Sequence, residues 1–215
     1  MSSDLVEITL LSLAVSGAAT LVSLLIGLPI GTWLALYLFR SRHVVLSVVN
    51  TGMALPPVVA GLFVALLLWR SGILGGLGLM YTPGAMVIAE VVIAVPIVMG
   101  LTVAALGQLD PRLQLQLQGL GASRWQTVWW LWREARLPLL AAVMAAFGSV
   151  ISEVGAAMMV GGNIAHETRV LTTAIVLETG RGEFGNAIVL GFVLMALAFI
   201  VNGVLTWAQQ RGPRR

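Results

Sequence analysis

Residues 8–39 read ITLLSLAVSGAATLVSLLIGLPIGTWLALYLF, and this run contains no charged side chain. A helix needs about 20 apolar residues to cross the hydrocarbon layer of a membrane, so the run predicts a membrane span. It is longer than a span requires, and Gly27, Pro29 and Gly31 within it favour a kink, a tilt or an end outside the bilayer. Its length and the acidic leader MSSDLVE are not those of a cleaved signal peptide, so we expect the run to remain in the protein.

The composition extends this prediction to the whole chain. Of the 215 residues, 59% are hydrophobic and only 10% are charged, and the mean hydropathy is +0.98. A soluble domain carries about a quarter charged residues. We therefore expect one all-α integral membrane domain over residues 1–215, with about five spans and one long loop at 110–136. The four further spans are predicted at 44–69, 82–109, 137–160 and 184–208.

Several kinds of site chemistry are excluded by what the chain lacks. All twelve basic residues are arginines, so there is no lysine for a phosphate-binding loop, a Schiff base or a Ser-Lys dyad. There is no cysteine, and the two histidines are far apart in the sequence. We expect a chain that is not an enzyme and holds no cofactor or metal ion of its own.

The arginines also predict an orientation. Five spans place the termini on opposite sides, and arginine is favoured in cytoplasmic segments. The segments on one side hold nine arginines and those on the other side hold three. We therefore expect the N-terminus outside, and the loop 110–136 and the C-terminus in the cytoplasm. The nine are Arg40, Arg42, Arg112, Arg124, Arg133, Arg136, Arg211, Arg214 and Arg215, against Arg70, Arg169 and Arg181.

The loop 110–136 has the signals of two short helices. Asp110 followed by Pro111 is typical of a helix start. Gly121 permits a turn, and Ser123 followed three residues later by Gln126 predicts a capping box that opens a second helix.

Tryptophans mark that second helix. Trp125, Trp129 and Trp132 recur at i, i+4 and i+7, so they share a face, and tryptophan favours the membrane interface. From the residues alone two interpretations stay open: a helix that anchors the next span, or a docking element for a cytoplasmic partner.

The stretch LGASRWQTVW (120–129) resembles the EAA loop of permease subunits in ATP-binding cassette (ABC) importers. That loop forms a coupling helix seated on a separate ATPase. The chain departs from the pattern, because Leu115, Gln116 and Leu117 replace the Glu-Ala-Ala triplet, and because Leu137-Pro138 lies four residues farther from the glycine than is usual. The resemblance implies docking and coupling roles for Gly121, Ala122, Ser123, Arg124, Gln118 and Glu134.

Other segments resemble the same group. The stretches 54–68, 81–98 and 152–164 are similar to molybdate- and sulfate-type permeases, and the long GASRWQT–REARLP spacing with residues 161–191 is similar to tungstate importer permeases. The resemblance implies a type I importer fold, a homodimer working by alternating access, an ATPase partner that holds ATP and magnesium, and an outer oxyanion-binding protein. It also implies the cytoplasmic membrane of a bacterium or archaeon, with lipid and no nucleic acid around the chain.

Two carboxylates fall inside predicted spans. Glu90 and Glu153 both lie in the outer half of the bilayer by residue count, and an ionisable group there is a functional candidate. A carboxylate repels an oxyanion, so we expect no direct ligation. Either backbone groups near Gly155 satisfy these side chains, or they belong to a gate. The candidates for the gate or pathway are Glu153, Gly155, Asn163 and Glu90.

Two alternatives to a tungstate permease are kept. One is a molybdate, sulfate or methionine-type ABC permease. The other, from a different class, is a secondary transporter. Against the second, the spans show no internal duplication and no paired charges of the kind used in ion coupling.

Overall fold

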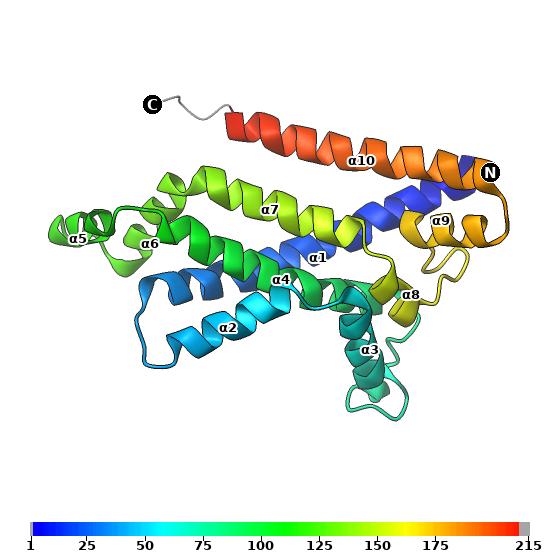
Figure 1. Cartoon of the computed structure of the whole chain (residues 1–215), viewed down its shortest axis with the longest axis horizontal. Coiled ribbons are helices and arrows are strands. Elements are labelled where there is room, and N and C mark those ends of the chain that lie inside the picture. The colour runs from blue at the N-terminus through cyan, green and yellow to red at the C-terminus, as the bar shows by residue number, and fades with distance from the viewer. Residues whose placement is uncertain (1, 211–215) are drawn as a thin grey trace.

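The computed structural model describes residues 2–210, and its regular elements are all helices (Figure 1). This confirms the predicted all-α class. The long apolar helices are α1 (Ser2–Leu36), α4 (Pro83–Gly107) and α10 (Phe184–Gln210). The others are α2 (Arg42–Met53), α3 (Pro57–Leu68), the short 3-10 helix η1 (Gly75–Leu77), α5 (Pro111–Gly119), α6 (Arg124–Glu134), α7 (Arg136–Ile151), α8 (Gly155–Gly161) and α9 (Leu171–Gly180).

The apolar helices provide three to five membrane crossings. α1, α4 and α10 are each long and apolar enough to span, and the number rises to five if each of two sharply bent helix pairs counts as one span. α1 continues as one helix past Pro29. The terminal arginines Arg211, Arg214 and Arg215, used above for orientation, lie outside the described residues.

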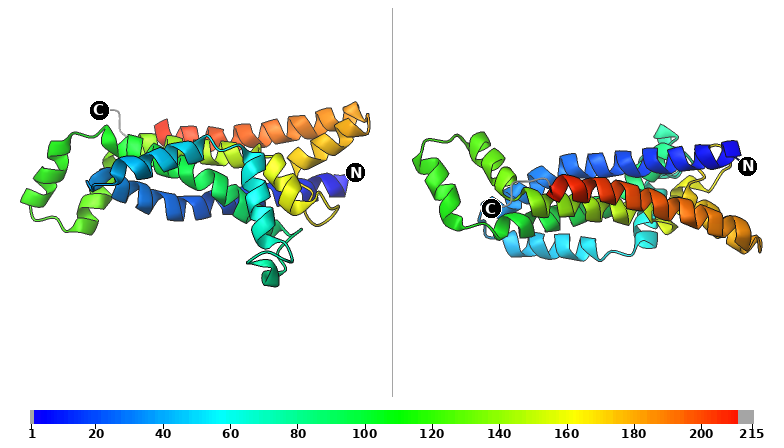
Figure 2. Two further views of the ribbon diagram at one scale, coloured as in Figure 1. Left: turned by 60° about the horizontal axis from the view of Figure 1, so that its bottom comes forward. Right: turned by 90° about the horizontal axis from the view of Figure 1, so that it is seen from above.

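The predicted span 44–69 is two helices and not one straight span. α2 and α3 meet at an angle of 100°, and α3 projects from the bundle in Figure 1 and in the left view of Figure 2. Pro56 causes the break, because it disfavours helical backbone at the residue before it and offers no N–H. Pro57 then occupies the first helical position of α3, where a proline is well tolerated.

A second break interrupts the predicted span 137–160. α7 ends at Ile151, and α8 starts at Gly155 after a short non-helical segment. At its other end α7 follows α6 after a bend of 76°. Pro138 lies in the first turn of α7, where its missing N–H breaks no helical hydrogen bond.

Small residues bring α1 and α4 together side by side and in the same direction. Ala19, Ser23, Gly27 and Gly31 recur every four residues along α1. A Cβ atom at Gly27 would lie 2.7 Å from the side chain of Val98, and one at Gly31 would lie 2.8 Å from Cβ of Thr102. Such small residues at four-residue spacing allow close helix contact in lipid, where van der Waals packing drives association.

Candidate functional site

The candidate residues gather at the two ends of the bundle. One end carries α5 and α6, and we call it the α5–α6 end. The other carries the start of α1 together with α8 and α9, and we call it the α8–α9 end (Figure 1). The docking candidates lie at the first end and the gate candidates toward the second.

The turn between α5 and α6 is built around Gly121. Its φ is +82°, its N–H donates to the carbonyl of Gln118 at 3.0 Å, and the next N–H, of Ala122, donates to the carbonyl of Leu117 at 3.0 Å. These two bonds form a Schellman motif, in which a glycine with left-handed backbone closes a helix. The turn therefore requires a residue that accepts positive φ at position 121.

The capping box predicted after this turn is present. The Ser123 hydroxyl accepts from the Gln126 N–H at 3.4 Å, and the Ser123 N–H donates to Oε1 of Gln126 at 2.8 Å. At the start of α5, Asp110 accepts from the N–H of Arg112 at 2.8 Å. The side chains of Asp110 and Ser123 thus cap the N-termini of α5 and α6, and hydrogen bonds fix the turn between the two helices.

The three tryptophans on one face of α6 have different environments. Trp125 is 85% exposed and Trp129 is 64% exposed, whereas Trp132 is partly buried and its Nε1 donates to Oγ1 of Thr32 at 2.8 Å. The three tryptophans therefore share a helix face but do not form one exposed surface. The reason is that the end of α6, at Leu131, packs into the bundle, while its start extends beyond it.

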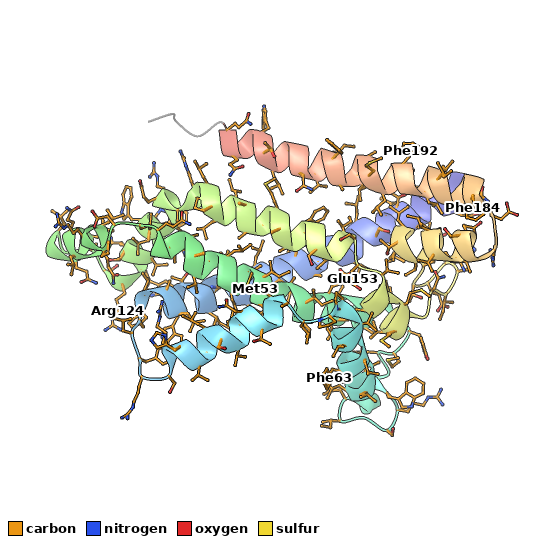
Figure 3. The ribbon with its side chains drawn as sticks, viewed as in Figure 1. Met53, Phe63, Arg124, Glu153, Phe184 and Phe192 are labelled. Carbon is orange, nitrogen blue, oxygen red and sulfur yellow. The ribbon has the colours of Figure 1, made fainter. Side chains whose placement is uncertain are left out.

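A hollow of about 230 Å³ lies between this loop and the end of α1. Three of the six predicted docking residues, Gln118, Ala122 and Arg124, line it. Arg124 is the charged residue of the lining (Figure 3). Glu134 is exposed at the far end of α6 and does not line the hollow. The full lining is Leu36, Tyr37, Gln114, Gln118, Ala122, Arg124, Thr127 and Val128.

Glu153 occupies the break between α7 and α8 (Figure 3). Its side chain is buried and Oε1 accepts from the N–H of Ala156 at 3.0 Å. Its backbone carbonyl accepts from the hydroxyl of Thr172 at 2.8 Å. The carboxylate is thus held by a backbone N–H at the start of α8, and the Thr172 contact ties the break to α9.

Glu90 of α4 is close to this break. It is 3% exposed, and the side chains of Ser16 on α1 and of Glu153 lie near it. Its Oε2 has no hydrogen-bond partner among the described residues. The fold therefore brings the two intramembrane carboxylates together at the meeting point of α1, α4 and α8.

Gly155 and Gly61 join α8 to α3. A Cβ atom at Gly155 would lie 2.5 Å from a methyl group of Val58, and one at Gly61 would lie 2.6 Å from the Cα atom of Ala156. Only glycine permits such approach, so the protruding helix α3 and the short helix α8 pack as one unit.

Asn163 organises the loop that follows α8. Its backbone has φ of +54°, its Nδ2 donates to the carbonyl of Thr173 at 3.4 Å, and its Oδ1 accepts from Nε of Arg169 at 3.2 Å. Thr172 and Thr173 are buried. In this conformation Asn163 binds Arg169 and the backbone of Thr173, and these bonds hold the loop against the start of α9.

His166 joins the same loop to the start of α1, a contact that the sequence did not predict. Its Nδ1 lies 2.9 Å from Oε2 of Glu7. The hydrogen bond and the charge of Glu7 raise the pKa of His166 above its usual value of 6.5. The pKa of His166 is higher in the folded protein than in the unfolded chain. The small stabilisation from this exposed pair is therefore present at low pH, where His166 is protonated, and is lost as the pH rises through the folded pKa.

Fold and site together define a multi-pass helical membrane protein with a structured loop at one end and an interrupted helix toward the other. The profile of the family described as "Binding-protein-dependent transport system inner membrane component" matches residues 27–211. The chain belongs to this family, as the resemblance predicted.

Individual relatives agree with this assignment. The chain is 39% identical over 216 residues to a probable anion ABC transporter permease protein of Haloferax volcanii, covering 98% of this chain and 93% of the relative. It is 36% identical over 203 residues to the tungstate uptake system permease protein TupB of Peptoclostridium acidaminophilum, covering 94% and 89%.

A solved structure shows the same fold. The match is to the MetNI methionine ABC transporter in inward-facing conformations, with a TM-score of 0.72 at 22% identity over 98% of this chain and 95% of that chain. The chain is thus the permease subunit of an ABC importer, a multi-pass inner-membrane protein of a family that works with an ATPase subunit and a substrate-binding protein.

Proposed function

We propose that this chain is the permease subunit of a tungstate importer, and that two copies form the pathway. The observation that carries the proposal is the 36% identity to a tungstate uptake permease over 94% of this chain. The 39% identity to a probable anion permease supports an anionic substrate independently.

The loop between α5 and α6 is the proposed docking site for the ATPase. Its turn and both of its helix starts are fixed by hydrogen bonds. Exposed Trp125 and Trp129 of α6 give it apolar area to bury. Arg124, lining that hollow, suits an acidic or carbonyl group of the partner.

The proposed mechanism is alternating access. ATP and magnesium bind the partner ATPase, whose closure draws together the docking loops of the two permease copies. The α7–α8 break at Glu153 and the α3–α8 unit lie toward the opposite end, where the pathway opens to the binding protein. Glu153 and Glu90 act in this scheme as parts of the gate's packing and not as ligands, because their charge repels an oxyanion.

Reconstitution tests the proposal. The permease is placed in liposomes with the ATPase that co-purifies with it, and tungstate is supplied on its binding protein. We expect ATP-dependent tungstate uptake, weaker uptake of molybdate and sulfate, and none of methionine. The chain alone should hydrolyse no ATP, since it has no lysine for a phosphate-binding loop. A preference for molybdate, sulfate or methionine would contradict tungstate as the substrate. Uptake driven by an ion gradient without ATP would contradict the assignment to an ATP-driven importer and indicate a secondary transporter.

The proposed orientation has its own test in this chain without cysteine. A cysteine for labelling should replace an exposed residue that makes no structural hydrogen bond. Ser123 and Asn163 make such bonds, so we choose exposed Leu115 in the α5–α6 loop and exposed Ala165 in the loop after α8. We expect an impermeant thiol reagent added outside intact cells to label Ala165→Cys and to spare Leu115→Cys until the cells are opened. The reverse pattern would place the α5–α6 end outside and contradict docking of a cytoplasmic ATPase there.

A further inference from the structure

α1 is hydrogen-bonded at both of its ends to segments distant in the sequence. Toward the α5–α6 end, Oγ1 of Thr32 accepts from Nε1 of Trp132 at 2.8 Å. Toward the α8–α9 end, Oγ of Ser12 accepts from the N–H of Leu171 at 2.8 Å. At 1.5 Å per residue the two contacts are about 30 Å apart, the thickness of a bilayer core. One helix therefore contacts both α6 and the start of α9.

The α1 residues that accept both bonds are buried, although Trp132 itself is only partly buried. Thr32 is 5% exposed, Ser12 is 4% exposed and Leu171 is fully buried. A hydrogen bond in such surroundings is electrostatically stronger than in water, and losing one partner leaves the other polar group unsatisfied. These bonds resist separation, so a displacement of α6 or of α9 acts on α1.

The contact at Leu171 continues to the gate candidates. The next residue, Thr172, donates its hydroxyl to the carbonyl of Glu153 at 2.8 Å. One turn beyond Ser12 along α1, the side chain of Ser16 lies close to Glu90. This part of α1 thus lies against α4 near Glu90 and is connected to the break at Glu153 through α9.

We propose that α1 transmits the movement of the ATPase-docking loop to the α7–α8 break, with Thr32 and Ser12 as the positioning residues at its two ends. The proposal rests on the proposed function, in which the α5–α6 loop docks the ATPase. It concerns a helix that the family profile covers only from residue 27 onward, so Ser12 lies outside the matched region.

A second route joins the same ends, and the test has to separate the two. α6 leads through a 76° bend into α7, which runs to Glu153. Thr32→Val removes the acceptor of Trp132 at nearly constant side-chain volume and leaves the α6–α7 connection intact. Thr102→Val is the matched control, because Thr102 is a fully buried threonine facing α1 whose hydroxyl has no partner among the described residues.

The measurement is tungstate uptake per ATP hydrolysed in liposomes that contain the permease, its ATPase and its binding protein. For Thr32→Val we expect ATPase co-purification at the wild-type level and about a fivefold fall in this ratio, the effect of one lost hydrogen bond. Thr32→Ser, which keeps the hydroxyl, should restore it, and Thr102→Val should leave it unchanged. Ser12→Ala should lower it similarly. The double variant of Ser12 and Thr32 should be no worse than either single one, because one break already interrupts a serial connection.

The outcomes separate the two proposals. A wild-type complex that binds no ATPase or transports no oxyanion contradicts the proposed function. If the wild type couples normally, the role of α1 is overturned by full coupling in Thr32→Val, by an equal loss in Thr32→Ser or Thr102→Val, or by additive losses in the double variant. Additive losses would indicate that the two contacts only stabilise the fold, and full coupling would assign transmission to α7.

Discussion

Gly31→Val is expected to prevent the stable packing of α1 on α4 and to lower the amount of folded permease in the membrane severely. A Cβ atom at this position would lie 2.8 Å from Cβ of Thr102 and 2.9 Å from the backbone oxygen of Met99. A backbone oxygen inside a helix cannot turn away, so the helices must separate. Overpacking of this kind lowers the free energy of unfolding by about 3 kcal/mol. The close contact between α1 and α4 at the neighbouring small residues is lost with it.

Gly17→Val provides the matched control for this prediction. Gly17 lies on the same helix, and a Cβ atom there would meet nothing within 4 Å. Both variants place a β-branched residue in α1 and share its small propensity cost, so their difference reports the contact with α4. The measurements are the yield of monodisperse protein in detergent and its thermal unfolding midpoint. Equal stability of the two variants would mean that α1 and α4 are not in close contact in the membrane.

Features that depend only on residues close together in the sequence could be predicted from it. The lack of charge in residues 8–39 identified the membrane class, because the cost of burying a charge in lipid is independent of the partner helix. The capping box of Ser123 and Gln126 and the helix start at Asp110 followed from spacing alone, since each contact lies within one turn.

The course of the chain through the membrane was less predictable. Hydropathy is the same for a straight span and for two helices at 100°, so residues 44–69 were predicted as one membrane span. Pro56 and Pro57 indicated a break but not its angle, which depends on the packing of α3 against α8 at Gly61 and Gly155.

The candidate site was predicted in its parts but not in its connections. Counting residues placed Glu90 and Glu153 in the same half of the bilayer, and the structure brings them together. The bond between Trp132 and Thr32 joins residues 100 positions apart. Periodicity grouped Trp132 with exposed tryptophans because it reports the face of a helix and not what that face meets.

Gly121→Val is expected to separate docking from folding. At φ of +82° a β-branched side chain clashes with its own backbone, at a cost of order 1–3 kcal/mol, and the Schellman motif that closes α5 opens. A Cβ atom there meets nothing within 4 Å, so the cost is one of backbone strain alone and the membrane helices are untouched. The variant should reach the membrane at near-normal levels, while co-purification with the ATPase falls about tenfold or more, the effect of roughly 1.4 kcal/mol.

Two substitutions make the measurement specific to the turn. Gly121→Asn should retain most binding, because asparagine accepts left-handed backbone more readily than other residues with a Cβ atom. Gly119→Val should bind normally, since Gly119 ends α5 without positive φ and a Cβ atom there also meets open space. The readouts are ATPase co-purification and hydrolysis stimulated by the loaded binding protein in liposomes. If Gly121→Val couples as well as Gly119→Val, the shape of this turn is not what the ATPase recognises, and the exposed tryptophans would be left with the role of anchoring α6 at the membrane surface.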